Sequence, residues 1–399
     1  MLSKTAKWNI GKLYALLSVR SFMIVLPILT LYFMDHGLTM QQVFLLQVFF
    51  AVLVILIEVP SGYFADVFSR KSSLTIGAIF GFAGFIAYWL ADGFSGFLFA
   101  EFFLALSVGF LSGADSAILY DTLLAENVEK LYTKYEGRFL SFRTGTEAIA
   151  ALIGTSLLLI MPFKDLFFCQ AIIMFFMIPI ALSIKEPEVH VAKEERKSVL
   201  QVLKFAIHEN PKLRYLNTFG AFLYSSTLVM VWYSQPLWKN IGMPLVYFGI
   251  VWAGMNLLVA LSSFFAHKLD EHLSFKTLFT WLAFVPIVIY SLLALAVHNS
   301  EFIPYYVIVA VTALFWIFRG FYTPIIKDYI NKEADSSTRA TVLSVQSLFN
   351  NLIFSALSPF LGWVADIWSF GTAFYISALV FGIPAIIFFF LLHARMKTY

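Results

Sequence analysis

The feature that most constrains this chain is a succession of long apolar segments separated by short polar connections. An apolar helix of about 20 residues spans a hydrocarbon layer of roughly 30 Å, and in that layer every backbone amide must bond within its own segment. The segments therefore predict membrane-spanning helices rather than strands or a soluble core. We expect twelve spans, at residues 10–34, 41–65, 73–91, 95–122, 138–161, 166–184, 213–236, 244–268, 276–297, 303–327, 340–365 and 371–393.

The composition excludes most soluble classes of protein. Of the 399 residues, 60% are hydrophobic and 13% are charged, against about half and about a quarter in soluble domains. The seven histidines are scattered, and no Walker loop, G-x-G-x-x-G or H-E-x-x-H motif occurs. We therefore expect no enzymatic activity, no cofactor and no metal site. The single Cys169 excludes a disulfide within the chain and is expected to be a small core residue.

The basic residues predict the orientation of the spans. With both termini in the cytoplasm, 22 of the 27 lysines and arginines fall on the cytoplasmic side, and only Lys164 and Lys239 fall in outer loops. This bias satisfies the positive-inside rule. The net charge of +3 is then a topology signal, and it predicts no nucleic-acid partner. We expect a multi-pass protein of the plasma (inner) membrane, with its first apolar run retained as a span.

One long polar connection divides the chain. It predicts an N-terminal six-helix bundle at 1–184, a cytoplasmic linker at 185–212 and a C-terminal six-helix bundle at 213–399. Apolar residues of the linker are spaced as the stripe of a short interfacial helix beginning near Ser198. The alternative for this helix is a regulatory or partner-binding element.

The two halves carry an internal repeat. Ser61–Asp66 aligns with Ser262–His267, and Gly113–Asp121 aligns with Gly320–Asp328. The alignment continues into the following spans, where Gln346 falls opposite Arg143 and Asn350 falls opposite Glu147. A duplicated six-helix unit is an expected plan for a transporter.

The hairpin between the second and third spans carries a charged motif. The motif reads G-x-x-x-D-x-x-S-R-K and consists of Gly62, Asp66, Ser69, Arg70 and Lys71. It resembles the signature loop between helices 2 and 3 of the major facilitator superfamily, which usually has glycine where this chain has Ser69. The resemblance implies an all-α integral membrane fold of twelve helices in two pseudo-symmetric six-helix bundles, with helices 1, 4, 7 and 10 lining a cavity.

The same resemblance implies a latch, meaning a set of contacts that holds the cytoplasmic side closed. In this latch Arg70 pairs with Asp121, and Asp66 accepts hydrogen bonds from the start of the span at 340–365. Gly62 permits the close approach of helices. Asp328 is the repeat counterpart of Asp121. The loop facing it carries His267, Glu271 and His272 in place of the motif's charged residues, which does not favour a second latch.

Charged residues within the spans are candidate binding or coupling groups, because a charge at mid-membrane is costly unless it is paired or hydrated. Glu58 is one charge within a span, and the candidates for binding or coupling are Arg20, Glu101, Asp115, Arg143, Glu147 and Arg319. Matching depths pair Arg20 with Glu147 and Asp115 with Arg143, while Arg143 and Glu147 are also four residues apart on one helix. Fixed structural ion pairs are the alternative to contact with substrate or exchange of a proton. Arg319 has no acid at its depth, which favours a role facing the cavity.

Aromatic residues make up 18% of the chain. Most are expected to face lipid or to pack between helices. Tyr32, Trp232 and Tyr233 are candidates for a cavity wall suited to a ring-bearing or amphipathic solute. Gln346 and Asn350 would supply neutral hydrogen bonds to the same solute.

These observations predict an alternating-access secondary transporter that is coupled to protons by symport or antiport. The intramembrane arginines favour a small anionic or zwitterionic organic solute, and the aromatic residues favour an amphipathic one. Export across the plasma membrane is the leading direction. Proton-coupled import of a nutrient or metal chelate is the alternative, and a non-transporting receptor or scaffold is a remote one. The expected partners are the solute, protons and membrane lipid, and the expected state is a monomer.

Overall fold

The computed structural model describes residues 2–187, 210–333 and 339–396. Within these residues the regular structure is helical throughout, with no strand, so the predicted all-α class is confirmed. The short helix predicted within the linker lies outside the described residues. The remainder divides into two compact units, which are described one at a time.

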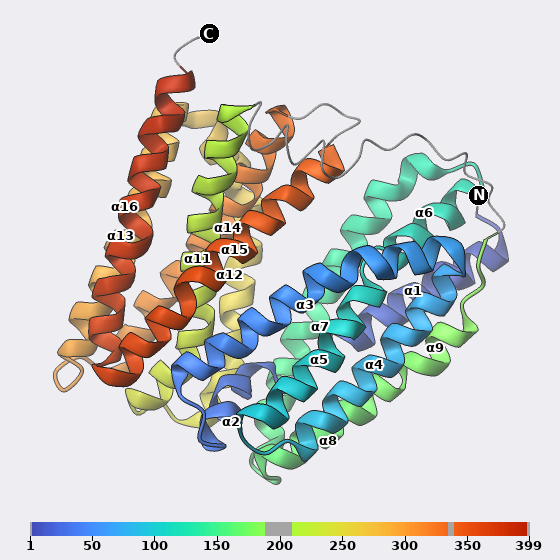
Figure 1. The fold of residues 1–399 in the computed structure, drawn as a ribbon, viewed down its shortest axis with the longest axis horizontal. Helices are drawn as coiled ribbons and strands as arrows, with labels where there is room; N and C mark the ends of the chain where they lie inside the picture. The colour runs from blue at the N-terminus through green and yellow to red at the C-terminus, as the bar shows by residue number, and fades with distance from the viewer. Residues whose placement is uncertain (1, 188–209, 334–338, 397–399) are drawn as a thin grey trace. The chain divides into compact units, whose positions relative to one another are not determined.

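Unit 1 consists of Met1–Leu38, Phe49–Ala192 and Val246–Ala253. Its helices are α1 (Lys4–Ser21), η1 (Leu26–Ile28), α2 (Leu29–Asp35), the larger part of α3 (Met40–Val67), α4 (Arg70–Leu90), α5 (Gly93–Leu111), α6 (Ala114–Leu124), η2 (Glu129–Leu131), α7 (Tyr132–Leu157), α8 (Phe163–Phe175) and α9 (Met177–Ser183). Helix α4 packs against α5, α8 and α9 (Figure 1). Helix α1 packs against α6, α7 and α9.

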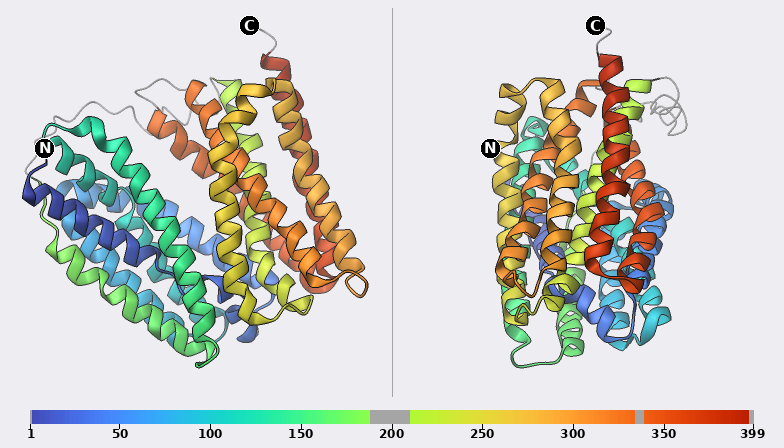
Figure 2. Two further views of the ribbon diagram at one scale, coloured as in Figure 1. Left: turned by 180° about the vertical axis from the view of Figure 1, so that it is seen from behind. Right: turned by 90° about the vertical axis from the view of Figure 1, so that its left-hand side faces the viewer.

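Unit 2 consists of Thr39–Val48, Lys193–Leu245 and Gly254–Tyr399. Its helices are α11 (Pro211–Asn240), the first residue of η4 (Leu245–Tyr247), most of α12 (Phe248–His272), α13 (Phe275–His298), α14 (Tyr305–Glu333), α15 (Arg339–Ile367) and α16 (Phe370–Met396). Helix α13 runs alongside α16, and α11 packs against α14, α15 and α16 (Figure 2).

The helices follow the predicted spans. Ten helical segments among the described residues are long and apolar enough to cross a membrane. The other two predicted spans are also long helices, α7 and α11. These two helices contain more polar residues. Helix α7 carries charged side chains such as Arg143 and Glu147, and α11 carries buried polar side chains such as Asn217 and Ser226.

Small residues set the close packing within unit 1. A Cβ atom on Gly77 or Gly84 of α4 would lie 2.7 Å from Leu111 or 2.6 Å from Leu104 of α5. The backbone there also receives a hydrogen bond, because the Ser107 hydroxyl donates to the Gly77 carbonyl at 2.7 Å. Small residues at helix contacts let backbones approach, and packing replaces the hydrophobic effect as the driving force in lipid.

Buried tyrosines organise the core of unit 2. The Tyr290 hydroxyl of α13 donates to the Ser226 carbonyl of α11 at 2.6 Å. The ring of Tyr233 is fully buried and makes edge contacts with Phe44 and Phe374, with ring centroids 5.3 and 5.7 Å apart. These rings fix the packing of α11 because each combines a large apolar area with a defined geometry.

Candidate functional site

The first membrane pass of unit 1 is interrupted just after Arg20. Helix α1 ends at Ser21, and η1 begins at Leu26 with Pro27 in its first turn. The fully buried side chain of Gln170 satisfies the freed backbone, since its Oε1 accepts from the Ile24 N–H at 2.8 Å and its Nε2 donates to the Phe22 carbonyl at 3.1 Å. Irregular backbone at membrane depth requires partners of this kind.

The fourth pass is interrupted as well, although we predicted one continuous span at 95–122. Helix α5 ends at Leu111, and Gly113 adopts a φ of 79°, a left-handed conformation that side-chain-bearing residues avoid. Helix α6 then begins at Ala114, with Asp115 in its first turn. The break therefore places a carboxylate beside the positive end of a helix, where the dipole favours it.

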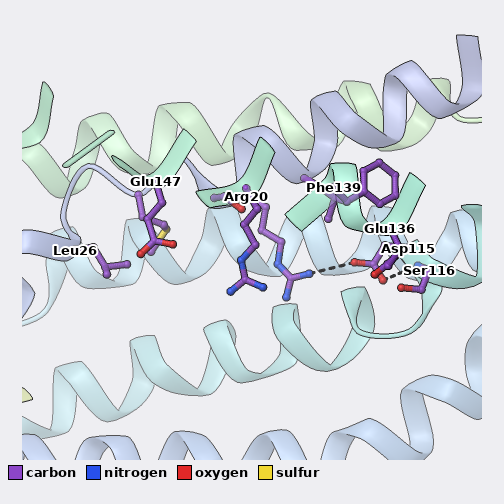
Figure 3. A pocket seen from close by; sticks show the side chains of 11 residues that line it. Arg20, Leu26, Asp115, Ser116, Glu136, Phe139 and Glu147 are labelled. Atoms are coloured by element: carbon purple, nitrogen blue, oxygen red, sulfur yellow. Dashed lines mark hydrogen bonds and ion pairs between the residues drawn. The ribbon is translucent and has the colours of Figure 1, made fainter. Parts of the chain in front are cut away.

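A cavity of about 220 Å³ opens beside these two breaks. Its walls come from α1, from the segment after α1, from α6 and from α7 (Figure 3). The lining residues are Leu17, Arg20, Ser21, Met23, Leu26, Asp115, Ser116, Glu136, Phe139, Arg143 and Glu147. Four of the six candidate charges are thus gathered at one cavity, with apolar side chains between them.

The charges in this cavity are not paired as their depths predicted. The guanidinium of Arg20 forms its ion pair with Asp115, at 3.5 Å, and Asp115 also accepts from the Ser116 backbone N–H at 2.7 Å. Matching depths predict Glu147 as the partner of Arg20 and Arg143 as the partner of Asp115. The structure differs because the chain breaks at Gly113 and begins a new helix, which places Asp115 beside Arg20 of α1. Glu147 lies at the other end of the cavity, near Leu26 (Figure 3).

Sequence reasoning missed one acid of the cavity, Glu136. It lies two residues before the predicted span at 138–161 and is therefore not among the candidate charges within the spans. Helix α7 begins earlier, at Tyr132, and brings Glu136 onto the face that carries Arg143 and Glu147. The spacing of seven and four residues along this stripe is the signal that could have found it, because such spacing shares one helix face.

Two other predicted residues of unit 1 lie elsewhere. Glu101 is 4% exposed and accepts a hydrogen bond from the Tyr88 hydroxyl at 2.5 Å. Tyr32 is fully buried, with its ring stacked on Phe167 at 3.9 Å and its hydroxyl donating to the Tyr88 carbonyl at 3.1 Å. Both belong to an aromatic cluster, and neither lines the described cavity.

The candidates of unit 2 are spread over α11, α14 and α15. Arg319 is partly buried, and the described residues place no acid within ion-pair distance of it. Its guanidinium lies within electrostatic range of the hydroxyls of Tyr224 and Tyr322. Gln346 is buried, and the Oδ1 atom of Asn350 is buried without a hydrogen-bond partner in the described part of the chain. Trp232 is partly buried and Tyr233 fully buried.

The ion pair predicted for the latch is present. Arg70 contacts Asp121, and its Nη1 atom also donates to the Ala117 carbonyl at 3.2 Å. The sequence did not indicate that Glu186, at the start of the linker, joins this loop: its carboxylate accepts from the Arg70 backbone N–H at 2.7 Å and from the Ser69 hydroxyl. Gly62 lies within α3, Lys71 lies in the first turn of α4, and the side chain of Asp66 lies outside the described residues.

The second half has a related contact with the charges reversed. Asp328 pairs with Lys332 one turn along α14 at 2.6 Å, and Lys332 also lies 3.6 Å from Asp270 of α12. The end of α12 thus contributes the acid and α14 contributes the base, whereas in the first half Arg70 of α4 is the base and Asp121 of α6 is the acid. The motif between the second and third spans carries an arginine at this position, so it does not predict an ion pair in which the base is Lys332.

Solved structures of other proteins share this arrangement of helices. The nucleoside transporter NupG superposes with a TM-score of 0.77 at 13% identity, covering 98% of this chain and 99% of its own. A bacterial homolog of the human lysosomal transporter Spinster gives 0.72 at 16% identity and 98% coverage of both chains. A D-xylose-proton symporter gives 0.67 at 13% identity and 96% coverage of both chains.

These likenesses show the fold that the helices build, a twelve-helix transporter fold. No curated protein sequence gives a significant match to this chain. The family model described as Major Facilitator Superfamily matches residues 13–318, a range that includes both helix breaks, the cavity and the latch loop. The chain is a membrane protein that belongs to the major facilitator superfamily.

Proposed function

We propose that this protein is a proton-coupled, alternating-access secondary transporter that exports a small amphipathic solute of anionic or zwitterionic character across the plasma membrane. The observation that carries the proposal is the charged cavity of unit 1, which opens where two membrane passes both lose their helical form. Transporters bind substrates at such interrupted helices, because free helix ends and unwound backbone offer polar groups at membrane depth. We further propose a monomer with both termini in the cytoplasm.

The cavity walls support the amphipathic character of the solute. Leu17, Met23 and Phe139 offer apolar surface, while Arg20 and Arg143 offer fixed positive charge. A volume of about 220 Å³ is smaller than the roughly 300–1,000 Å³ of pockets that enclose drug-sized ligands. The cavity therefore suits a small solute, or one charged end of a larger one.

The acids of the cavity support proton coupling. Asp115, Glu136 and Glu147 face a common space with two guanidinium groups. Carboxylates in a partly buried site can take up a proton when a nearby charge is withdrawn or a solute binds. A proton gradient can then drive the conformational change, because the protonated and ionised forms favour different states.

Import is a second candidate direction. One similar structure is titled a D-xylose-proton symporter, and another is a POT family transporter in complex with a conjugated peptide. If this chain works as they are described, the same cavity would take up a nutrient or a metal chelate together with protons.

A two-stage experiment tests the proposal. Purified protein is first screened by thermal shift against metabolites and drugs, since only a ligand of the folded form raises the midpoint in proportion to its occupancy. A radiolabelled hit is then followed in proteoliposomes with an imposed pH gradient, and in everted vesicles and whole cells. Export predicts accumulation in everted vesicles, and import predicts accumulation in cells. Binding without flux in any system would refute transport and favour a receptor.

A further inference from the structure

The two ends of the unit 1 cavity differ in their acids. Asp115, Ser116 and Glu136 group at one end, and Glu147 lies at the other, near Leu26 (Figure 3). Arg20 extends toward the first group, where its guanidinium reaches Asp115. This end of the cavity therefore holds two acids, and the described residues form one ion pair there, between Arg20 and Asp115.

Glu136 is the acid at this end that takes no part in the ion pair. The hydroxyls of Ser116 and Tyr132 lie near its carboxyl group, while its Oε2 atom is buried and has no hydrogen-bond partner among the described residues. Asp115, by contrast, has both Arg20 and a backbone N–H. A buried carboxylate oxygen without a donor loses its hydrogen bonds to water and gains none from the protein, which disfavours its ionised form.

The charged and titratable groups facing Glu136 come from three helices. Helix α1 contributes Tyr14, α6 contributes Asp115, and α7 itself contributes Tyr132, while Arg20 of α1 and Arg143 of α7 line the same cavity. The described cavity as a whole is lined by three carboxyl and two guanidinium groups. With every group ionised the lining carries one excess negative charge, and a single proton on Glu136 removes it.

We propose that Glu136 is the carboxyl group that takes up and releases the coupling proton, an assignment that rests on the proposed function and names the residue performing it. In the step, a hydronium ion gives its proton to Oε2 of Glu136, which leaves water and a neutral carboxyl group. Release to water on the other side of the membrane reverses the transfer. The ion pair of Arg20 and Asp115 lies at the same end of the cavity and positions this group.

Infrared difference spectroscopy tests the assignment without a known solute. Full-length protein in lipid nanodiscs is recorded across a pH titration, and the carbonyl stretch of a protonated carboxyl group is followed. The wild type is expected to show a band that grows as the pH falls. Every carboxyl group that titrates in this pH range contributes to the band, so each variant is compared with the wild type by subtraction. Glu136→Gln is expected to lose one component of the band, and Glu147→Gln, the matched control on the same helix and in the same cavity, is expected to keep that component.

Two further measurements keep the outcome clear. Circular dichroism and size-exclusion chromatography exclude misfolding, and Glu136→Asp should restore a titrating band. With a ligand from the thermal-shift screen, Glu136→Gln should lose accumulation driven by a pH gradient to a much larger extent than it loses solute exchange. Loss of that component in Glu147→Gln, or its survival in Glu136→Gln, would overturn the assignment. A wild type that carries solute without proton movement would instead overturn the proposed proton coupling.

Discussion

The carboxylate of Asp366, at the end of α15, accepts a hydrogen bond from the backbone N–H of Met40, the first residue of α3, at 2.7 Å, and a second from Gln41 at 2.8 Å. It thus caps a helix more than 300 residues away in the sequence. Gly362 makes the approach possible, since a Cβ atom there would lie 2.7 Å from the Cα atom of Gln41. The first N–H groups of a helix have no partner of their own, so this cap fixes where α3 begins.

The cap predicts a stability effect that can be separated from simple loss of charge. Asp366→Ala should destabilise the protein by about 1 kcal/mol, the usual effect of removing a helix cap, and should lower the thermal midpoint in detergent. Asp366→Asn keeps an acceptor and should lower it less. Asp92→Ala is the matched control, because Asp92 stands at the N-cap of α5 without making a capping hydrogen bond. Equal shifts for Asp92→Ala and Asp366→Ala would contradict this role.

The cytoplasmic latch predicts loss of flux without loss of binding. Arg70→Ala or Asp121→Asn should abolish transport in proteoliposomes while ligand affinity changes by no more than a few fold, because the pair sets conformational balance and lies away from the cavity. Lys71→Ala, next in sequence on α4, should reduce transport less than Arg70→Ala does.

Glu186 extends the same prediction to the linker. Glu186→Gln removes charge from the acceptor of the Arg70 N–H and should reduce flux less than Arg70→Ala does. Transport at wild-type rate in Arg70→Ala and Asp121→Asn alike would mean that the ion pair is structural only.

The pairing of Arg20 with Asp115 predicts a rescue. Arg20→Ala strands a carboxylate at 17% side-chain exposure, and its cost should lie between the roughly 0.2–1 kcal/mol of exposed pairs and the roughly 3–5 kcal/mol of breaking a buried one. Adding Asp115→Ala should recover part of that loss in thermal unfolding, because no unpaired charge remains. Adding Glu147→Ala instead should recover less. The reverse order would restore Glu147 as the partner predicted from depth.

Arg319 predicts a binding defect rather than a folding defect. No described acid lies within ion-pair distance of it, so Arg319→Ala should express and fold nearly as well as the wild type. Binding of an anionic solute should weaken at least about tenfold, or roughly 1.4 kcal/mol, by calorimetry. Arg319→Lys should recover only part of the affinity, since it lacks the planar fork of the guanidinium. Unchanged affinity in Arg319→Ala would remove this residue from the site.

The sequence by itself determined the helices, the family and one ion pair. Apolar length and the absence of soluble-protein composition require spanning helices, because lipid offers no partner to a free backbone amide. The short hairpin motif predicted the ion pair of Arg70 and Asp121, since a motif records residue types that are needed together at fixed spacing.

The tertiary structure alone decided the partners within the cavity and at the helix ends. Depth along a helix could be counted from residue numbers, but the direction of Asp115 depended on the break at Gly113. The inclusion of Glu136 depended on where α7 begins, and the capping of α3 by Asp366 depended on how closely Gly362 lets two backbones approach. Periodicity in a sequence reports which face of a helix is polar. Which residue meets that face is settled only when the helices pack.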